Sequence, residues 1–163
     1  REGEAFRPPQ AYPHLAAACV TTHDLPTLAG WWAGADVEER AALGLIGSHE
    51  ADASHDARAK EKRAFLDALR AAGALSDDLD ADGPYDPRLA VAAHAFVAAT
   101  PSLLALGHAE DCVGESVAVN LPGTDRERPN WRRRLSADVA AILASPALAP
   151  LRRRAMAKAE NTG

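Results

Sequence analysis

Residues 16–27 read AAACVTTHDLPT, a short apolar run that leads directly into polar side chains. Its first part, Ala16–Thr22, has the length of a buried strand and ends in β-branched residues, although its alanines weaken the strand preference. His23 and Asp24 follow immediately. The stretch therefore predicts a strand with polar groups gathered at its end.

Other stretches repeat this arrangement further along the chain. A second short apolar run, Leu103–Leu106, also leads into acidic residues, Glu110 and Asp111. Val117–Leu121 is a third candidate for extended structure. Helical patterns separate these runs, and the order of strand, helices, strand and helices predicts α/β units rather than an all-helical bundle.

Helix signals occupy most of the remaining sequence. Asp36 with Glu39 three residues later resembles a capping box at the start of a helix that runs through Ile46. Asp86 before Pro87 predicts another helix start. The predicted helices cover residues 36–46, 52–72, 87–99, 136–144 and 146–158, whereas 1–15 are predicted to be extended and 76–86 to form a solvated loop.

Composition limits the class of protein. The 163 residues are long enough to bury one sizeable core, and 47% of them are hydrophobic. A formal net charge of −5 argues against a general affinity for nucleic acid. No apolar run approaches the roughly 18 residues of a membrane span, so no membrane partner is expected. Cys19 and Cys112 cannot build a disulfide scaffold and are interpreted as buried thiols of a cytoplasmic protein.

His23 and Asp24 form the first candidate site. An imidazole beside a carboxylate can hold two adjacent hydroxyls of a sugar, because the carboxylate accepts hydrogen bonds and the imidazole donates one. In the structural alternative, Asp24 caps the helix entered at Pro26, and His23 is satisfied in the core. The residues alone leave both interpretations open.

The second candidate site lies in residues 119–131, which read VNLPGTDRERPNW. Pro122 and Gly123 specify a tight turn, since glycine tolerates a positive φ at little cost. Asn120 could then project its amide into a cleft, and Trp131 could present a flat apolar face. The alternative is a structured loop with Trp131 in the core.

Other polar or aromatic groups are interpreted structurally. His49 and His55 are six residues apart, which places them on different faces of a helix and argues against a metal site. Arg132–Arg134 and Arg152–Arg154 are interpreted as salt-bridging or helix C-terminal charges. Adjacent helix residues diverge by about 100°, so at most one tryptophan of the pair at 31 and 32 can face a ligand. No phosphate-binding loop, zinc spacing or nucleophile elbow occurs, and no cofactor is expected.

Taken together and in this order, the motifs resemble the bacterial 4-α-glucanotransferases (amylomaltases) of glycoside hydrolase family 77. Residues 22–27 (THDLPT) and 30–32 (GWW) resemble the His-Asp segment of that family. Its C-terminal signature is similar to residues 110–111 (ED), 119–124 (VNLPGT) and 129–133 (PNWRR). The spacing between these blocks also fits, and the resemblance extends from about Phe6 to Leu151.

The resemblance implies a retaining enzyme that transfers a segment of an α-1,4-glucan to another glucan on a TIM (β/α)8 barrel. Asp24 would be the carboxylate that stabilises the oxocarbenium-like transition state, and His23 would bind hydroxyls beside it. Asn120, Pro122 and Gly123 would bind substrate. The further candidates are Trp31, Trp131, Glu110 and Asp111, with capping of the following segment as the alternative for the two acids.

The same resemblance implies that the chain is one part of such an enzyme. In the family the nucleophile and the general acid/base precede the His-Asp motif, and the 22 residues before His23 contain no recognisable candidate. A complete barrel needs about 250 residues. We therefore expect residues 1–163 to be a single C-terminal fragment, inactive alone, that covers about the seventh and eighth βα units. Its expected parts are an extended lead-in (1–15), motif-bearing βα units (16–135) and terminal helices (136–160).

Two strands cannot close a barrel, and their edges and apolar faces would lie open. The isolated chain is therefore expected to be predominantly helical, with short strands and a tendency to self-associate. The alternative to a part of an enzyme is a non-catalytic helical module that binds glucan or a protein partner.

Overall fold

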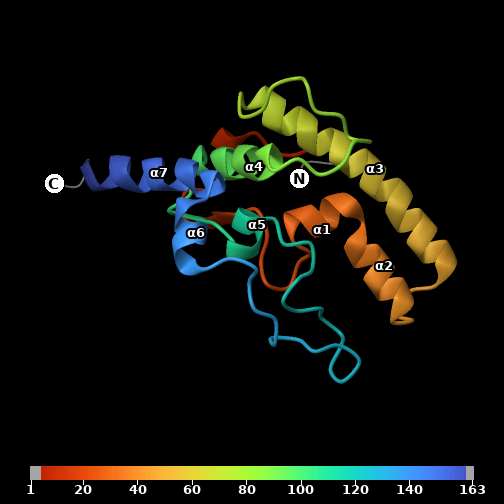
Figure 1. The fold of residues 1–163 in the computed structure, drawn as a ribbon. Helices are drawn as coiled ribbons and strands as arrows, with labels where there is room; N and C mark the ends of the chain where they lie inside the picture. The colour runs from red at the N-terminus through yellow and green to blue at the C-terminus, as the bar shows by residue number, and fades with distance from the viewer. Residues whose placement is uncertain (1–4, 161–163) are drawn as a thin grey trace.

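The computed structural model describes residues 5–160 and is mainly helical, with one small parallel sheet in that range (Figure 1). The elements, in chain order, are η1 (Pro9–Ala11), β1 (Ala17–Cys19), α1 (Leu28–Ala33), α2 (Ala35–Ala42), α3 (Ser48–Ala71), α4 (Arg88–Ala98), β2 (Leu104–Leu106), α5 (Ala109–Val113), α6 (Val139–Ala144), η2 (Pro146–Leu148) and α7 (Ala149–Glu160). A helix follows each strand, α1 after β1 and α5 after β2. The expected lead-in is irregular apart from η1, and its residues 1–4 lie outside the described range.

The two strands pair in parallel, with Ala17 opposite Leu104 and Cys19 opposite Leu106. Parallel neighbours need a long crossover, which α1 to α4 supply. The prediction of strands at both apolar runs is confirmed, although each strand has only three residues.

The third predicted extended segment, Val117–Leu121, is not a strand. Its backbone groups bond within a loop instead of a ladder. The Ala118 carbonyl accepts from Arg128 at 2.6 Å, and the Val119 carbonyl accepts from the backbone N–H of Trp131 at 3.0 Å. These partners satisfy the polar backbone without a neighbouring strand.

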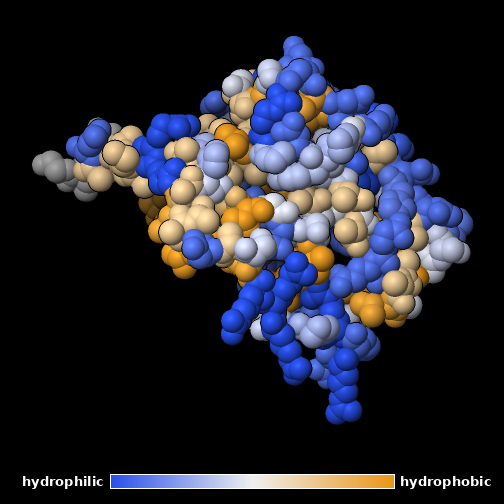
Figure 2. All heavy atoms as spheres, in the orientation of Figure 1, coloured by the Kyte–Doolittle hydropathy of each residue, from blue (hydrophilic) through white to orange (hydrophobic). Residues whose placement is uncertain are grey.

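One face of the sheet is covered and much of the rest is open. Ala18 is buried, and α4 packs against both strands, whereas Leu104 and Leu106 are about half exposed. Cys19 is exposed too, so the expectation of two buried thiols holds only for Cys112. Figure 2 shows further hydrophobic residues on the surface around α6. The two strands therefore leave apolar surface open, as expected for a sheet without further strands.

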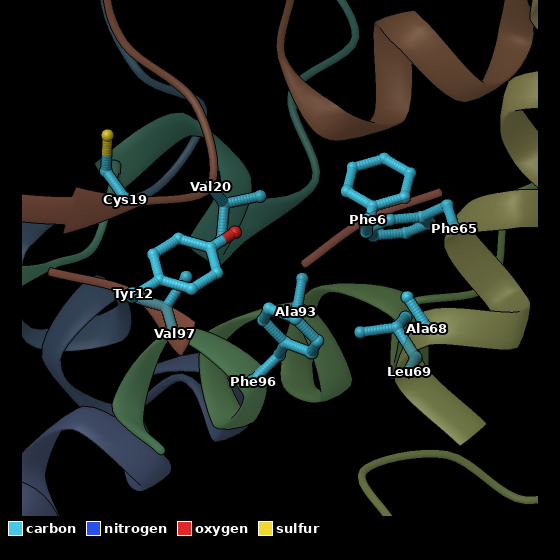
Figure 3. A pocket seen from close by; sticks show the side chains of 10 residues that line it. All are labelled: Phe6, Tyr12, Cys19, Val20, Phe65, Ala68, Leu69, Ala93, Phe96 and Val97. Carbon is cyan, nitrogen blue, oxygen red and sulfur yellow. The ribbon is translucent and has the colours of Figure 1, made fainter. Parts of the chain in front are cut away.

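The hydrophobic core lies between α1, α3 and α4. Trp32, Leu69 and Leu89 are almost completely buried there, and the Trp32 indole donates to the Gly83 carbonyl at 3.0 Å. Burying each of these side chains contributes about 1.5–3 kcal/mol. Beside this core a small apolar pocket of about 80 Å³ lies next to β1, where Phe6 lies against Phe65 (Figure 3).

The predicted capping box is absent at the start of α2. The N-cap of α2 is Gly34, with no side-chain cap, and the helix ends at Ala42 rather than Ile46. Asp36 instead forms a two-pronged ion pair with Arg58 at 2.8 and 2.9 Å, and Glu39 binds Arg128. Arginines brought in from elsewhere in the fold therefore bind both acids, which makes the prediction of a capping box wrong.

The remaining predicted helices are confirmed with shifted ends. Residues 52–72 belong to α3, 87–99 to α4, 136–144 to α6, and 146–158 to η2 and α7. Asp86 accepts from the Arg88 backbone N–H at 2.8 Å at the start of α4. Arg154 of α7 donates to carbonyl groups at the end of α4, including Ala98 at 2.9 Å. This confirms a helix C-terminal role for one residue of the triplet Arg152–Arg154.

No helix among residues 5–160 is long and apolar enough to cross a membrane.

Gly30 allows α1 to approach the segment after α5. A Cβ atom at Gly30 would lie 2.2 Å from the Ser116 carbonyl oxygen, which is far inside van der Waals contact. Gly30→Ala should therefore lower the free energy of unfolding by about 2–3 kcal/mol through overpacking. Urea denaturation followed by circular dichroism measures this loss.

Gly47→Ala is the matched control, because nothing lies within 4 Å of a Cβ at Gly47. Its loss should stay below about 1 kcal/mol, the scale of a weakened helix N-cap. Equal losses in the two variants would mean that the close approach at Ser116 is unimportant.

Candidate functional site

The loop between β1 and α1 carries His23 and Asp24 at the surface. Their side chains are 56% and 54% exposed, and His23 Nε2 lies 3.2 Å from Asp24 Oδ2. The N-cap of α1 is Thr27, whose hydroxyl accepts from the Gly30 N–H at 3.1 Å. Asp24 is therefore not a helix cap and His23 is not a core residue. Both are available to a ligand.

The second motif reaches the same place from the other end of the sequence. The Asn120 side-chain amide donates to Asp24 Oδ1 at 2.7 Å, although the two residues are 96 positions apart. One carboxylate thus contacts His23 through one oxygen and Asn120 through the other. The predicted site residues of the two motifs form one constellation.

A cleft of about 510 Å³ adjoins this constellation. Asp24 and Asn120 line it together with Pro122, and side chains of α2 form part of its wall. Clefts of roughly 300–1,000 Å³ are typical of small-molecule sites. The cleft therefore offers an exposed, oriented carboxylate to a polar ligand.

The turn at Pro122 and Gly123 has the predicted geometry. Gly123 has a φ of 87°, and the Thr124 N–H donates to the Leu121 carbonyl at 3.3 Å. Proline followed by a residue with positive φ defines a type II turn. Pro122 borders the Asp24 cleft, whereas Gly123 serves to shape the turn.

Trp131 lies beside His23, with ring centroids 5.2 Å apart. Its side chain is 60% exposed, so the alternative of a core tryptophan is wrong. Its φ of 62° is the only positive value outside glycine among residues 5–160. Such backbone costs about 1 kcal/mol or more for a bulky residue, and the surrounding loop must hold it in place.

Arg128 and Asn130 hold that loop, and sequence reasoning did not single out either residue. Arg128 is 6% exposed and binds Glu39 of α2 at 2.8 Å and Asn130 Oδ1 at 2.8 Å. Asn130 Oδ1 also accepts from the Leu121 N–H, and its amide donates to the Thr124 hydroxyl at 2.8 Å. A buried arginine has no spacing signal in a sequence, so only the fold could reveal this anchor.

Asp111 binds both ends of the loop that carries His23 and Asp24. It is 1% exposed, accepts a short hydrogen bond from the Thr21 hydroxyl, and accepts from the Leu28 backbone N–H at 2.6 Å. These partners stand at the two ends of the loop that carries His23 and Asp24. Asp111 therefore has a structural role. The alternative interpretation was that it caps the segment after it, whereas it binds the first N–H group of α1.

Glu110 and Trp31 also lie outside the Asp24 constellation. Glu110 pairs with His108 at 3.2 Å, and both side chains are mostly buried. Trp31 packs against Phe65 and under the Arg58 guanidinium, 5.0 Å from the ring centroid. It lines a separate apolar cavity of about 250 Å³ behind the loop. Their positions support packing roles.

Several other charged groups have partners close by. His55 pairs with Glu38 at 2.9 Å on the surface, and residues 5–160 contain no group of three or more potential metal ligands. Arg133 binds Glu115 at 2.9 Å, as expected for a salt-bridging residue. Burial raises the pKa of the Cys112 thiol to about 11, so this cysteine is an unreactive core group.

Comparison with known proteins places this arrangement in a family of glucan-modifying enzymes. Residues 1–140 match the 4-alpha-glucanotransferase family, glycoside hydrolase family 77. The 4-alpha-glucanotransferase of Mycobacterium tuberculosis is 34% identical over 125 residues, which cover 77% of this chain and 17% of that protein. The 4-alpha-glucanotransferase of Haemophilus influenzae is 30% identical over 143 residues, which cover 84% of this chain and 20% of that protein.

A solved structure agrees. The amylomaltase of Corynebacterium glutamicum matches 92% of this chain and 23% of its own, with a TM-score of 0.76 and 29% identity. This chain belongs to the 4-alpha-glucanotransferase family. It spans about a fifth of the length of the relatives it matches.

Replacing Asp111 tests its structural role. Asp111→Asn keeps the shape but removes the charge that strengthens the bonds to Thr21 and Leu28, and should cost about 2–3 kcal/mol of unfolding free energy. Asp24→Asn, at an exposed position, should change stability by less than about 0.5 kcal/mol. Chemical denaturation measures the unfolding free energy of both variants, and an equal loss in the two would argue against a structural role of Asp111.

Glu115 gives a pH-dependent test. It is buried, and hydrogen bonding from Ser136 and the Arg133 guanidinium holds its pKa below the ordinary value of 4.5. A lowered folded-state pKa contributes stability that is complete above 4.5 and is lost as the pH falls through the folded-state pKa. Glu115→Gln should therefore lower the Tm clearly near pH 7, and the difference from the unaltered chain should shrink as the pH falls below 4.5. A Tm loss independent of pH, measured by circular dichroism, would refute this linkage.

Proposed function

We propose that this chain supplies part of the catalytic groove of a 4-alpha-glucanotransferase. The longer protein would transfer a segment of an α-1,4-glucan to a glucose or glucan acceptor with retention of configuration. The observation that carries the proposal is the meeting of Asp24, His23 and Asn120 on a chain that belongs to this family.

Asp24 is suited to hold sugar hydroxyls. A carboxylate has about four acceptor positions; the Asn120 amide takes one on Oδ1, and His23 Nε2 lies 3.2 Å from Oδ2. The remaining positions can accept from the vicinal hydroxyls of a glucosyl unit, while the negative charge stabilises positive charge that develops at the anomeric carbon. Because both neighbours orient the carboxylate beforehand, little rearrangement is needed when the sugar arrives.

The two further carboxylates of a retaining mechanism would come from the rest of the longer protein. Retaining enzymes need a nucleophile and an acid/base group about 5–5.5 Å apart. The other acids that line the described cleft are Asp36 and Glu39, and each is bound by an arginine. Their roles are thus structural, and the isolated chain is expected to be inactive.

The strands β1 and β2 would be neighbouring strands, about the seventh and eighth, of a (β/α)8 barrel. Their parallel register and the half-exposed Leu104 and Leu106 support this placement, because further strands would cover such a surface. The His-Asp loop follows the carboxyl end of β1, where barrel enzymes keep their chemistry.

The expected ligands are malto-oligosaccharides or longer α-1,4-glucans. Carboxylate-based glycosyl transfer needs no metal or organic cofactor. Cys19 and Cys112 are free thiols, which supports a cytoplasmic protein.

Asp24→Asn in the longer protein should lower the rate of maltotriose disproportionation by roughly 10²–10³-fold, because a positioned charge at the reacting sugar is lost. Glucose release measures the rate. Stability should be retained, since the side chain is exposed and the amide keeps its shape.

Asp56→Asn is the matched control, since Asp56 is an exposed acid on α3, outside the cleft. It should leave the rate unchanged. An unchanged rate in Asp24→Asn would remove Asp24 from the mechanism. Glucose release by the 163-residue chain alone would contradict the placement of the nucleophile outside it.

A further inference from the structure

We propose that Trp131 is an aromatic platform on which one glucosyl unit of the glucan stacks, next to the unit held at Asp24. This inference rests on the proposed function and adds a second sugar subsite to it. The pyranose ring of glucose carries C–H groups on its faces and hydroxyls around its edge. A flat indole can therefore bind the face while polar side chains bind the edge.

The contacts place Trp131 one side chain away from the carboxylate. His23 Nε2 contacts Asp24 Oδ2 at 3.2 Å, and the His23 ring lies 5.2 Å from the Trp131 ring, centroid to centroid. Asn120 adds a second link, because it bonds Asp24 and also lines the cleft that contains Trp131. A chain of sugars with one unit at Asp24 would thus bring an adjacent unit toward the indole.

The indole is both accessible and held. Its side chain is 60% exposed despite its size, and the rings of Trp131 and His23 are tilted by 52°, so His23 covers only part of it. The backbone N–H of Trp131 donates to the Val119 carbonyl at 3.0 Å, and the neighbouring Asn130 bonds to Leu121 and Thr124 on both sides of the turn. Trp131 has a left-handed backbone and carries its large apolar side chain at the surface, where most of the side chain is open to solvent.

The surrounding cleft offers hydrogen-bonding partners to the hydroxyl groups of a sugar. It has a volume of about 600 Å³, and its lining includes Asn120, Asp125, Arg126 and Arg132 beside the indole. These side chains offer acceptors and donors of both charge signs, as hydroxyl groups require. Arg126, Arg128 and Arg132 outnumber Asp125 in this lining, so the assignment of a sugar rests on the family and on the open indole rather than on the charge of the cleft.

The other tryptophans show why the assignment is specific. Trp32 is 2% exposed, and Trp31 is packed between Phe65 and Arg58. Neither presents an open face next to Asp24. Of the three tryptophans in the sequence, Trp131 therefore combines exposure with proximity to the carboxylate.

Maltoheptaose titrated into the 163-residue chain, followed by nuclear magnetic resonance of the side-chain N–H groups, tests the proposal. Trp131→Phe removes one indole signal and so assigns it to Trp131, and the other two belong to Trp31 and Trp32. The Trp131 indole signal should shift with the side-chain amide of Asn120, while the other two stay in place. Trp131→Ala should weaken binding at least tenfold, and Trp131→Phe, which keeps a flat ring, about two- to threefold.

Met156→Ala is the control for loss of an exposed apolar side chain, since Met156 is 64% exposed on α7. It should leave the affinity unchanged. A shift at Asn120 without a shift at Trp131, or an unchanged affinity in Trp131→Ala, would overturn the platform and leave the proposed function standing. No shift at any of these groups would also overturn the platform, whereas the proposed function is decided separately, by the rate of Asp24→Asn in the longer protein.

Discussion

The buried carboxylate of Asp111 is the constraint on which the site depends. A charge that is 1% exposed must be compensated, and it finds the Thr21 hydroxyl and the Leu28 N–H. One of these partners ends the strand region of the first βα unit, and the other begins α1. Asp111 itself belongs to α5, which follows β2. A single side chain thus joins the two units and fixes both ends of the loop that presents Asp24.

The segment from Ser116 to Trp131 has no regular secondary structure, yet three links hold it against the first unit. Gly30 of α1 lets the Ser116 carbonyl approach closely, and Arg128 binds Glu39 of α2. Asn120 bonds Asp24 directly. Because these contacts fall along the length of the loop, it can position polar side chains without a strand or helix of its own. Figure 1 shows this segment as the long connection between α5 and α6.

Much of the fold could be predicted from local pattern. The apolar runs at 16–22 and 103–106 indicated strands, because short apolar segments bounded by polar residues need burial on a sheet. The pattern of residues 117–121 looked similar but formed a loop, since Arg128 and Trp131 satisfied its carbonyls. The capping box at Asp36 failed for a related reason: an arginine distant in sequence binds the acid more strongly than a helix end. Local rules were wrong where a distant charged or polar group competed.

The sequence by itself determined the family, and it predicted His23, Asp24 and Asn120 as site residues because they stand in motifs whose order and spacing resemble that family. It also determined the tight turn at Gly123, since only glycine adopts that backbone cheaply. Tertiary structure alone decided which of the candidate residues lie together at the surface and which are buried. It brought Asn120 to Asp24 across 96 positions, exposed Trp131 and buried Asp111. Burial and distance between remote residues depend on how the helices pack around the sheet, and no local pattern records that packing.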